Sequence, residues 1–200
     1  MIVCETPRLR LRYITPQDAA FILALLNEPD FIRNIGDRKI RTLEDAQRYI
    51  LDGTVTGYEK VGFGLYLVEL KETGTPIGVC GLLKREYLED VDVGLALSAR
   101  FHRQGFGFEA TTAVLQHGRD VLGIGRIVAI TSPDNQESIR LLVRLGLRFE
   151  RMIQVPGVDR ETRLFVPVTP ATSAAADSAR SVNPEHVQDE VQACAEQRGS

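Results

Sequence analysis

The sequence predicts an α+β fold with a mixed, mostly antiparallel sheet of about six or seven strands. Apolar segments at 63–70, 77–83 and 91–97 follow one another through short turns, which is typical of an antiparallel meander. The third segment leads through a glycine-containing loop into a helical pattern, and a further apolar segment at 126–131 follows. A run of strands followed by helices and strands in this order indicates an α+β protein.

The first fifty residues combine one strand with short helices. Apolar residues alternate with arginines over 8–14, which predicts a half-buried strand whose arginines form a solvated face. A Thr-Pro pair opens a helix over 15–27, because threonine caps a helix and proline fits its first turn. Residues 31–35 fit either a short helix or a turn, and the capping pattern Thr-Leu-Glu-Asp predicts a helix over 42–50.

After the glycine loop, helices and strands alternate. A helix is predicted over 105–121, where apolar residues recur at helical spacing, and β-branched residues mark a strand at 126–131. The turn Ser-Pro-Asp-Asn then leads into a helix that ends before Gly146. The last two apolar segments, 147–153 and 161–168, predict a closing hairpin.

The length and the apolar content of 44% fit one ordinary domain, predicted over residues 1–169. From 170 to 200 the composition changes to Ala, Ser, Asp and Gln without large apolar residues, which is typical of a disordered tail. This tail holds five acidic and two basic residues, which accounts for the whole net charge of −3. The neutral domain that remains argues against nucleic-acid binding, which needs a basic face.

The three cysteines are scattered, and neither a disulfide framework nor a metal site is predicted from Cys4, Cys80 and Cys194. Free cysteines fit a reducing cytosol, so the expected location is cytoplasmic. No apolar run approaches the length of a membrane span, and the N-terminus lacks the basic start and apolar core of a signal peptide. We therefore expect no membrane partner.

Gly105 and Gly107 stand where the loop after residues 91–97 turns into a helix. Such a turn directs several backbone N–H groups at one point with the helix dipole behind them, which suits a phosphate group. The same glycines also fit an ordinary turn before a helix. The dinucleotide fingerprint G-x-G-x-x-A matches 105–110, but seven mostly polar residues, 98–104, separate it from the strand and disfavour that interpretation.

This loop resembles that of the GNAT acetyltransferases, which carry Q/R-x-x-G-x-G/A after a central strand and hold the pyrophosphate of acetyl-CoA there. Gln104, Gly105, Phe106 and Gly107 fit the last four positions of the pattern. His102 stands where the family usually has Gln, Arg or an aromatic residue, and it has no assigned role.

Two further stretches resemble one branch of this family, the enzymes that acetylate the N-terminal amine of ribosomal proteins. One is Thr-Pro-Arg-Leu-Arg-Leu-Arg at 6–12, followed by a Thr-Pro-x-Asp helix start. The other is 133–140, with Leu145-Gly146 beyond it. The resemblance covers about residues 5–168 and implies the GNAT fold, with a sheet splayed at the acetyl-CoA site and helices on both faces.

The resemblance implies acetyl-CoA as the co-substrate and no metal. Backbone N–H groups from Gln104 to Phe108 would hold the pyrophosphate, and the backbone of Leu95 and Leu97 would pair with the pantetheine arm. An N–H near Leu97 would also polarise the thioester carbonyl. Asn135 fits a side-chain hydrogen bond to CoA, and it also fits a helix N-cap. The expected cofactor-binding residues are Leu95, Leu97, Gln104, Gly105, Phe106, Gly107, Phe108 and Asn135.

Ser138 and Asp92 are the candidate catalytic residues. By resemblance, Ser138 lies near the sulfur and protonates the leaving thiolate; the alternative is a plain polar helix residue. Asp92, in Asp-Val-Gly, matches the family's acidic residue on this strand and is the candidate general base. Its alternatives are an exposed strand carboxylate and deprotonation by water, since an α-amine has a pKa of about 8.

Together these features predict an acetyl-CoA-dependent N-acetyltransferase that acts on a primary amine, a protein N-terminal α-amine among them. A small amine, such as an antibiotic, a polyamine or an amino acid, is the other acceptor class. A non-catalytic sensor of acyl-CoA is the alternative of another kind. The first two helices and the final hairpin are expected to set acceptor specificity, and both a monomer and a homodimer fit the sequence.

Overall fold

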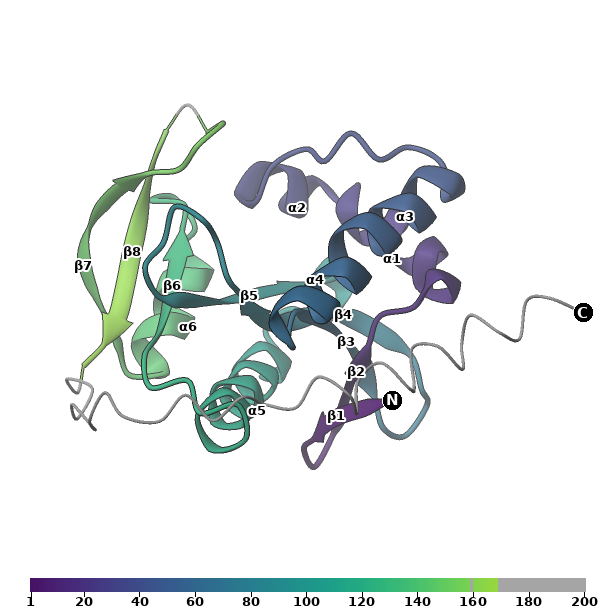
Figure 1. Ribbon diagram of the computed structural model, residues 1–200, viewed down its shortest axis with the longest axis horizontal. Helices are drawn as coiled ribbons and strands as arrows, with labels where there is room; N and C mark the ends of the chain where they lie inside the picture. Colours follow the sequence, from purple (N-terminus) through teal and green to yellow (C-terminus); the bar gives the residue numbers. More distant parts are fainter. Residues whose placement is uncertain (159, 169–200) are drawn as a thin grey trace, which may run out of the picture.

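A mixed sheet of eight strands organises the chain, in the order β1-β2-β3-β4-β5-β6-β8-β7 (Figure 1). The computed structural model describes residues 1–158 and 160–168, and these strands lie within them. The strands are Ile2–Glu5 (β1), Leu9–Tyr13 (β2), Leu65–Leu70 (β3), Pro76–Leu83 (β4), Val91–Leu97 (β5), Ile127–Thr131 (β6), Leu147–Gln154 (β7) and Glu161–Pro167 (β8). All neighbours pair antiparallel except β5 and β6, which run parallel. The predicted α+β class and the mostly antiparallel sheet are confirmed, with eight strands instead of six or seven.

Helices cover both faces of this sheet, as expected (Figure 1). They are the 3-10 turns Pro16–Asp18 (η1) and Ala99–Phe101 (η3), the π-helical segment Ile50–Val55 (η2), and the α-helices Ala19–Leu26 (α1), Pro29–Asn34 (α2), Leu43–Tyr49 (α3), Thr56–Val61 (α4), Phe106–Asp120 (α5) and Gln136–Arg144 (α6). Residues 31–35, which fit a helix or a turn, belong mostly to α2.

Two apolar layers hold these helices to the sheet. On one face, α1 and α3 pack on strand residues that include Leu67 and Val79. On the other face, α5 buries Val114 against Tyr66 and Val68. Because successive strand residues point to opposite faces, β3 serves both layers with adjacent side chains. The central strands are therefore apolar on both sides, which explains their continuous apolar sequence.

Two parts of the fold were not expected from the sequence. Strand β1 is only four residues long, and it pairs with β2 at the sheet edge. Residues 50–61 continue α3 through η2 into α4, and this extension buries Tyr58. The rings of Tyr13 and Tyr66 lie 4.5 and 6.0 Å from that of Tyr58, so tertiary packing stabilises a segment with weak helical propensity.

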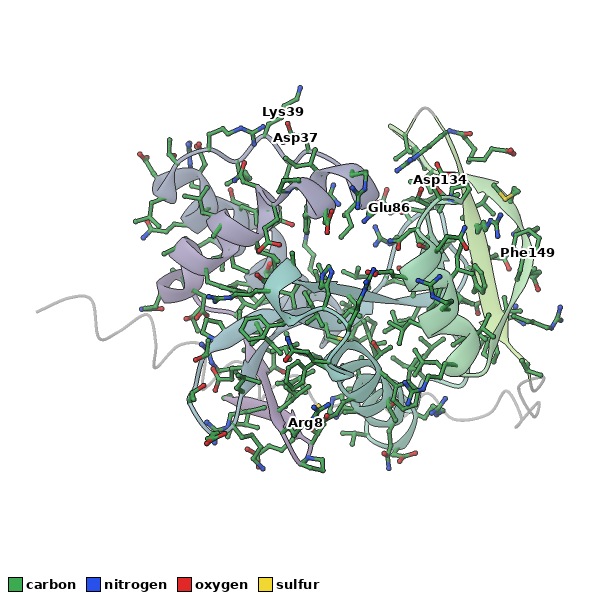
Figure 2. All side chains as sticks on the ribbon, turned by 180° about the vertical axis from the view of Figure 1, so that it is seen from behind. Arg8, Asp37, Lys39, Glu86, Asp134 and Phe149 are labelled. Carbon is green, nitrogen blue, oxygen red and sulfur yellow. The ribbon has the colours of Figure 1, made fainter. Side chains whose placement is uncertain are left out.

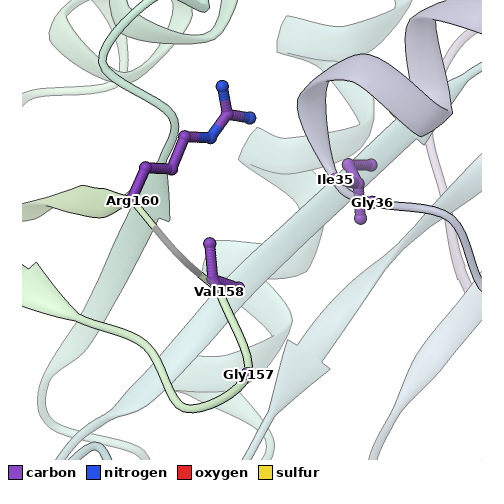
Figure 3. A pocket seen from close by; sticks show the side chains of 5 residues that line it. All are labelled: Ile35, Gly36, Gly157, Val158 and Arg160. Atoms are coloured by element: carbon purple, nitrogen blue, oxygen red, sulfur yellow. The ribbon is translucent and has the colours of Figure 1, made fainter.

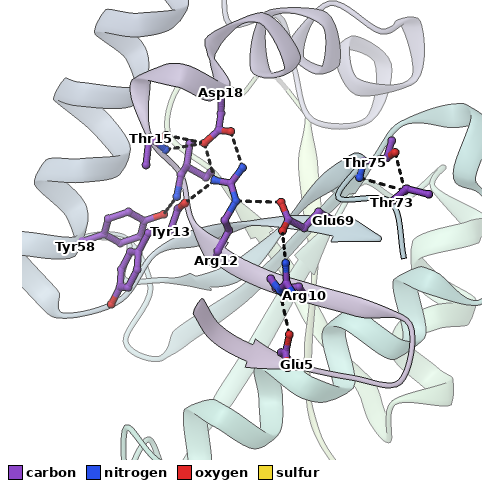
Figure 4. A network of polar contacts seen from close by, with 11 residues as sticks. Glu5, Arg10, Arg12, Tyr13, Thr15, Asp18, Tyr58, Glu69, Thr73 and Thr75 are labelled. Carbon is purple, nitrogen blue, oxygen red and sulfur yellow. Dashed lines mark hydrogen bonds and ion pairs between the residues drawn. The ribbon is translucent and has the colours of Figure 1, made fainter. Parts of the chain in front are cut away.

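The arginines of β2 share a partly exposed face, with 34% and 26% of the Arg10 and Arg12 side chains accessible, and both form ion pairs there. Arg12 donates to both Asp18 oxygens at 2.8 and 2.9 Å and to Glu69 at 3.0 Å (Figure 4). Arg10 bridges Glu5 and the buried Glu69. These charges tie β1, β2, β3 and the start of the first helix together. Burial alone would raise the pKa of Asp18, but its bonds to Arg12 and Thr15 lower it.

The predicted tail, residues 170–200, lies outside the described residues. Among the described helices, none combines the length and the apolar character that crossing a membrane requires.

Candidate functional site

A gap opens in the sheet between β5 and β6. These two strands pair only at Val91 with Ile127 and at Asp92 with Val128, and no pair follows in the described residues. On its other edge, β5 pairs with β4 along six consecutive positions. Beyond Asp92, one edge of β5 therefore has no neighbouring strand, as the predicted splay requires.

The backbone groups of Leu95 and Leu97 face this gap. Ser98 N donates to Ile77 O of β4 at 2.9 Å, and successive strand residues direct their polar backbone groups to alternate edges. Leu95 and Leu97 thus direct theirs away from β4. The ring nitrogen Nε2 of His102 lies 2.9 Å from Leu97 O, which gives this histidine a role that the sequence left open. The Leu97 carbonyl is engaged, while its N–H faces the gap.

Four backbone donors lie together where the loop enters α5. Gly105, with φ of 84°, is the N-cap residue, and only glycine adopts this conformation without strain. From Gly105 to Phe108, no backbone N–H donates to an acceptor among the described residues, and Glu109 N is the first to bond, to Gly105 O at 3.1 Å. The start of α5 therefore offers several N–H groups and its dipole to an anion.

Gly107 permits a close approach between this helix and β5. A Cβ atom at Gly107 would lie 3.1 Å from Leu95 Cδ2 and 3.7 Å from Leu141 Cδ2 of α6. A side chain here would press on the side chains of Leu95 and Leu141. The absence of a side chain at Gly107 therefore lets α5 pack closely on β5 and α6.

The side chains of the loop support its shape. Gln104 Nε2 donates to Arg100 O at 2.9 Å, and Phe106 is buried beneath the Arg8 guanidinium, 4.3 Å from its ring centre. Phe108 lies under Arg144 at 3.9 Å. The binding capacity of 104–108 therefore lies in its backbone.

Arg8, the residue before β2, also contacts α5 through Glu109. Its Nε donates to Glu109 Oε2 at 2.7 Å and its backbone N to Oε1 at 3.0 Å, with a further bond from Thr6. Burial alone would raise the pKa of Glu109, but these bonds outweigh it and lower the pKa. The motif at 6–12 thus holds the start of α5 in place. This contact was not predictable from the sequence, because about 100 residues separate its partners.

Asn135 and Ser138 lie at the start of α6, beyond the end of β6. Asn135 is the N-cap residue, and its Oδ1 accepts from Ser138 N at 3.0 Å, which confirms the N-cap interpretation. Its role toward CoA stays a prediction. Ser132, at the end of β6, is buried and its Oγ has no hydrogen-bond partner among the described residues. Sequence reasoning missed this hydroxyl, and no local pattern marks it.

Asp92 is buried where the ladder to β6 ends. Its side chain is 1% exposed and its Oδ1 accepts from Arg85 Nε at 2.8 Å. The alternative of an exposed strand carboxylate is therefore wrong. Burial raises the pKa of Asp92 above its ordinary value, although Arg85 opposes the shift. The sequence did not reveal Arg85 as its partner.

A groove of about 390 Å³ lies between the end of α2 and the connection of β7 to β8. Its lining residues are Ile35, Gly36, Gly157, Val158 and Arg160 (Figure 3). Arg160 Nη2 donates to Arg33 O at 2.9 Å and so joins the two sides of the groove. Figure 2 places Glu86 and Asp134 at this end of the molecule and Arg8 at the opposite end. These are the regions that the sequence associated with acceptor specificity.

The profile of the GNAT acetyltransferase domain matches residues 8–148. An uncharacterized N-acetyltransferase of Bacillus subtilis, YoaA, is 30% identical over 154 residues, which cover 76% of this chain and 86% of that protein. A putative GnaT-family acetyltransferase from Bordetella pertussis is similar in structure, with a TM-score of 0.70 and 21% identity, covering 84% of this chain and 99% of the other.

A second solved structure is RimL, a ribosomal L7/L12 alpha-N-protein acetyltransferase in complex with coenzyme A. Its TM-score is 0.71 at 17% identity, and the match covers 83% of this chain and 97% of RimL. The domain match spans well over half of the chain and includes the gap in the sheet, the glycine loop and the start of α6. The chain belongs to the GNAT family of acetyltransferases.

Proposed function

We propose that this acetyltransferase moves the acetyl group of acetyl-CoA to a primary amine, and that its acceptor is a protein N-terminal α-amine. One observation carries the proposal: four backbone N–H groups, Gly105 to Phe108, lie beside the open edge of β5, and neither these groups nor that edge has a backbone partner within 1–158 and 160–168. Acetyl-CoA supplies the acetyl group as a thioester, which an amine converts to an amide with release of the thiol.

The residues at the gap fit the two parts of this co-substrate. The N–H groups of 104–108 and the dipole of α5 attract a diphosphate. The backbone of Leu95 and the N–H of Leu97 accept an extended, amide-containing arm as an added strand would. The close packing at Gly107 holds the start of α5 against the Leu95 side chain of the same strand. Asn135 keeps its Nδ2 as a donor toward the same ligand, because its Oδ1 serves the helix cap.

The N–H of Leu97 is the proposed donor to the thioester carbonyl, which gains negative charge as the amine attacks. Ser138 is the proposed acid that gives its hydroxyl proton to the departing sulfur. Asp92 is the proposed acceptor of the amine proton. Since Asp92 is buried against Arg85, we place a water molecule between it and the amine.

The acceptor choice follows from the cost of removing a proton. Roughly a tenth of an α-amine is neutral at pH 7, against well under a hundredth of a lysine side chain, from their pKa values of about 8 and 10.4. A buried carboxylate that acts through water suits the easier acceptor. We place the peptide chain that follows the amine in the groove between α2 and the β7–β8 connection. The name of the structurally similar RimL supports the same acceptor class.

A free-thiol assay with a panel of amines tests this function. The panel contains peptides with free N-termini, the same peptides with blocked N-termini and an internal lysine, polyamines, amino acids and aminoglycosides. We expect thiol release with the free peptides alone, and mass spectrometry should place the acetyl group on the α-amine. Release with small amines only would replace the proposed acceptor class. Binding of acetyl-CoA without release from any acceptor would favour a sensor.

A further inference from the structure

An ion pair joins the glycine loop to the first turn of α6. Arg103 donates through Nε and Nη2 to Glu137 Oε1 at 3.0 and 2.9 Å. The Nδ1 atom of His102 lies 3.7 Å from the other oxygen of Glu137. Because the loop follows β5 and α6 follows β6, these contacts connect the segments that continue from the two strands beside the gap.

The carboxylate of Glu137 engages a cation beside the proposed phosphate site. Arg103 directly precedes the segment 104–108, and its φ of 60° is uncommon for a residue with a side chain. A guanidinium at this point would attract a phosphate. In the structure the Arg103 donors bind Glu137 instead. The Glu137 carboxylate therefore places a negative charge beside the site proposed for the negatively charged phosphates.

Arg8, which pairs with Glu109 in the first turn of α5, differs from Arg103. Glu109, the partner of Arg8, also accepts from Thr6 and from the Arg8 backbone, and its side chain is 17% exposed. Glu137 and Arg103 have side chains that are 44% and 84% exposed. A pair as exposed as this is weak and screened by salt, so another anion can replace the carboxylate. The Arg8 pair is built into the fold, whereas the Arg103 pair can exchange.

We propose that Glu137 is an exchangeable counter-ion for Arg103, and that a phosphate group of acetyl-CoA takes its place when the co-substrate binds. This inference rests on the proposed function, because it needs the phosphates at 104–108. In the free protein, Glu137 neutralises Arg103 and bridges the loop to α6. On binding, Arg103 turns to the phosphate, and Glu137 limits the affinity because it competes for the same guanidinium.

Calorimetric titration with CoA tests the exchange through a double-mutant cycle. We expect Glu137→Gln to bind CoA about two- to fivefold more tightly than the wild type, which corresponds to one exposed ion pair. We expect Arg103→Gln to bind more weakly. The gain from Glu137→Gln should vanish in the Arg103→Gln background, because the carboxylate acts through that guanidinium. It should also shrink when salt is raised from about 0.05 to 0.5 M.

Asp134→Asn is the matched control. It removes the same charge three residues before Glu137. The Asp134 side chain, however, is 90% exposed and lies 3.9 Å from Arg160. We expect its effect on CoA affinity to be smaller than that of Glu137→Gln. If Asp134→Asn and Glu137→Gln change the CoA affinity equally, or if the gain in Glu137→Gln persists without Arg103, the exchange is overturned. The effect would then come from the loss of negative charge in general. If the wild type binds CoA and Glu137→Gln has the same affinity, the exchange is overturned but the proposed function is not. If the wild type binds no CoA, both fail.

Discussion

The two edges of β5 differ in what their backbone groups do. Toward β4, six residue pairs form a continuous ladder, and Gly78 of β4 lies so close to β5 that a Cβ atom would be 2.3 Å from Ala96 O. Toward β6, the ladder stops after two pairs. A single strand thus serves the fold on one edge and offers unpaired backbone to a ligand on the other. The rigid edge positions the open one, which is the geometry that an extended ligand needs.

The closed edge should be the more sensitive to added volume. We expect Gly78→Ala to lower the free energy of unfolding by about 3 kcal/mol, because the added methyl group meets the backbone of Ala96 and Leu97, which cannot yield like a flexible side chain. Urea denaturation measures the change. Gly125→Ala is the control, since nothing lies within 4 Å of its Cβ position. Equal stability of both variants would mean that β4 and β5 shift freely.

The open edge should lose function and keep its fold. We expect Gly107→Glu to weaken CoA binding more than about a hundredfold, a change of roughly 2.7 kcal/mol, since its side chain displaces Leu95 and its charge repels a phosphate at 105–108. A glutamate in the first turn of a helix is otherwise well tolerated. Calorimetry gives the affinity and circular dichroism checks the fold. Gly57→Glu on α4, with open space around it, should bind normally.

The proposed acid beside the open edge can be separated from binding. We expect Ser138→Ala to lower kcat about tenfold and to leave the affinity for acetyl-CoA unchanged, because the cap bond uses the backbone N of Ser138. Steady-state kinetics and calorimetry measure the two quantities. Ser132→Ala should be measured beside it, since Ser132 Oγ is buried without a partner among the described residues. A loss of kcat in Ser132→Ala alone would reassign the proton donor.

The proposed base at the end of the short ladder should affect the pH profile. Burial raises the pKa of Asp92, so the acid limb of kcat/KM should lie above that of an exposed aspartate. Arg85 opposes this shift, and Arg85→Gln should therefore move the limb to still higher pH. Asp92→Asn should remove the limb. A profile that is the same in wild type and Asp92→Asn would leave water alone to deprotonate the amine.

Features marked by local pattern were predictable from the sequence. Alternating and continuous apolar segments gave seven of the eight strands that the structure describes, and Gly105 and Gly107 marked the start of α5. Strand β1 and helix α4 were missed, because four residues carry little periodicity and Tyr58 is held by distant rings. Tertiary packing decides such segments.

The pairings around the site were not predictable for a related reason. Arg85 with Asp92, Arg8 with Glu109, and Arg103 with Glu137 join residues on different elements. No local rule connects such partners, and without a fold they remain isolated charges. The same limit explains why Asp92 was weighed as an exposed carboxylate, since its burial and its partner Arg85 are properties of the folded chain.

One measurement tests the central claim most directly: amide chemical shifts recorded by NMR while wild-type protein is titrated with acetyl-CoA. We expect the largest saturable changes at Leu95, Leu97 and 105–108, with little change at the β4 residues Val79 and Gly81. This pattern would locate the ligand on the open edge of β5. Saturable binding with its largest changes at the groove residues Ile35 and Val158, or along β4, would contradict the assignment of the gap to acetyl-CoA.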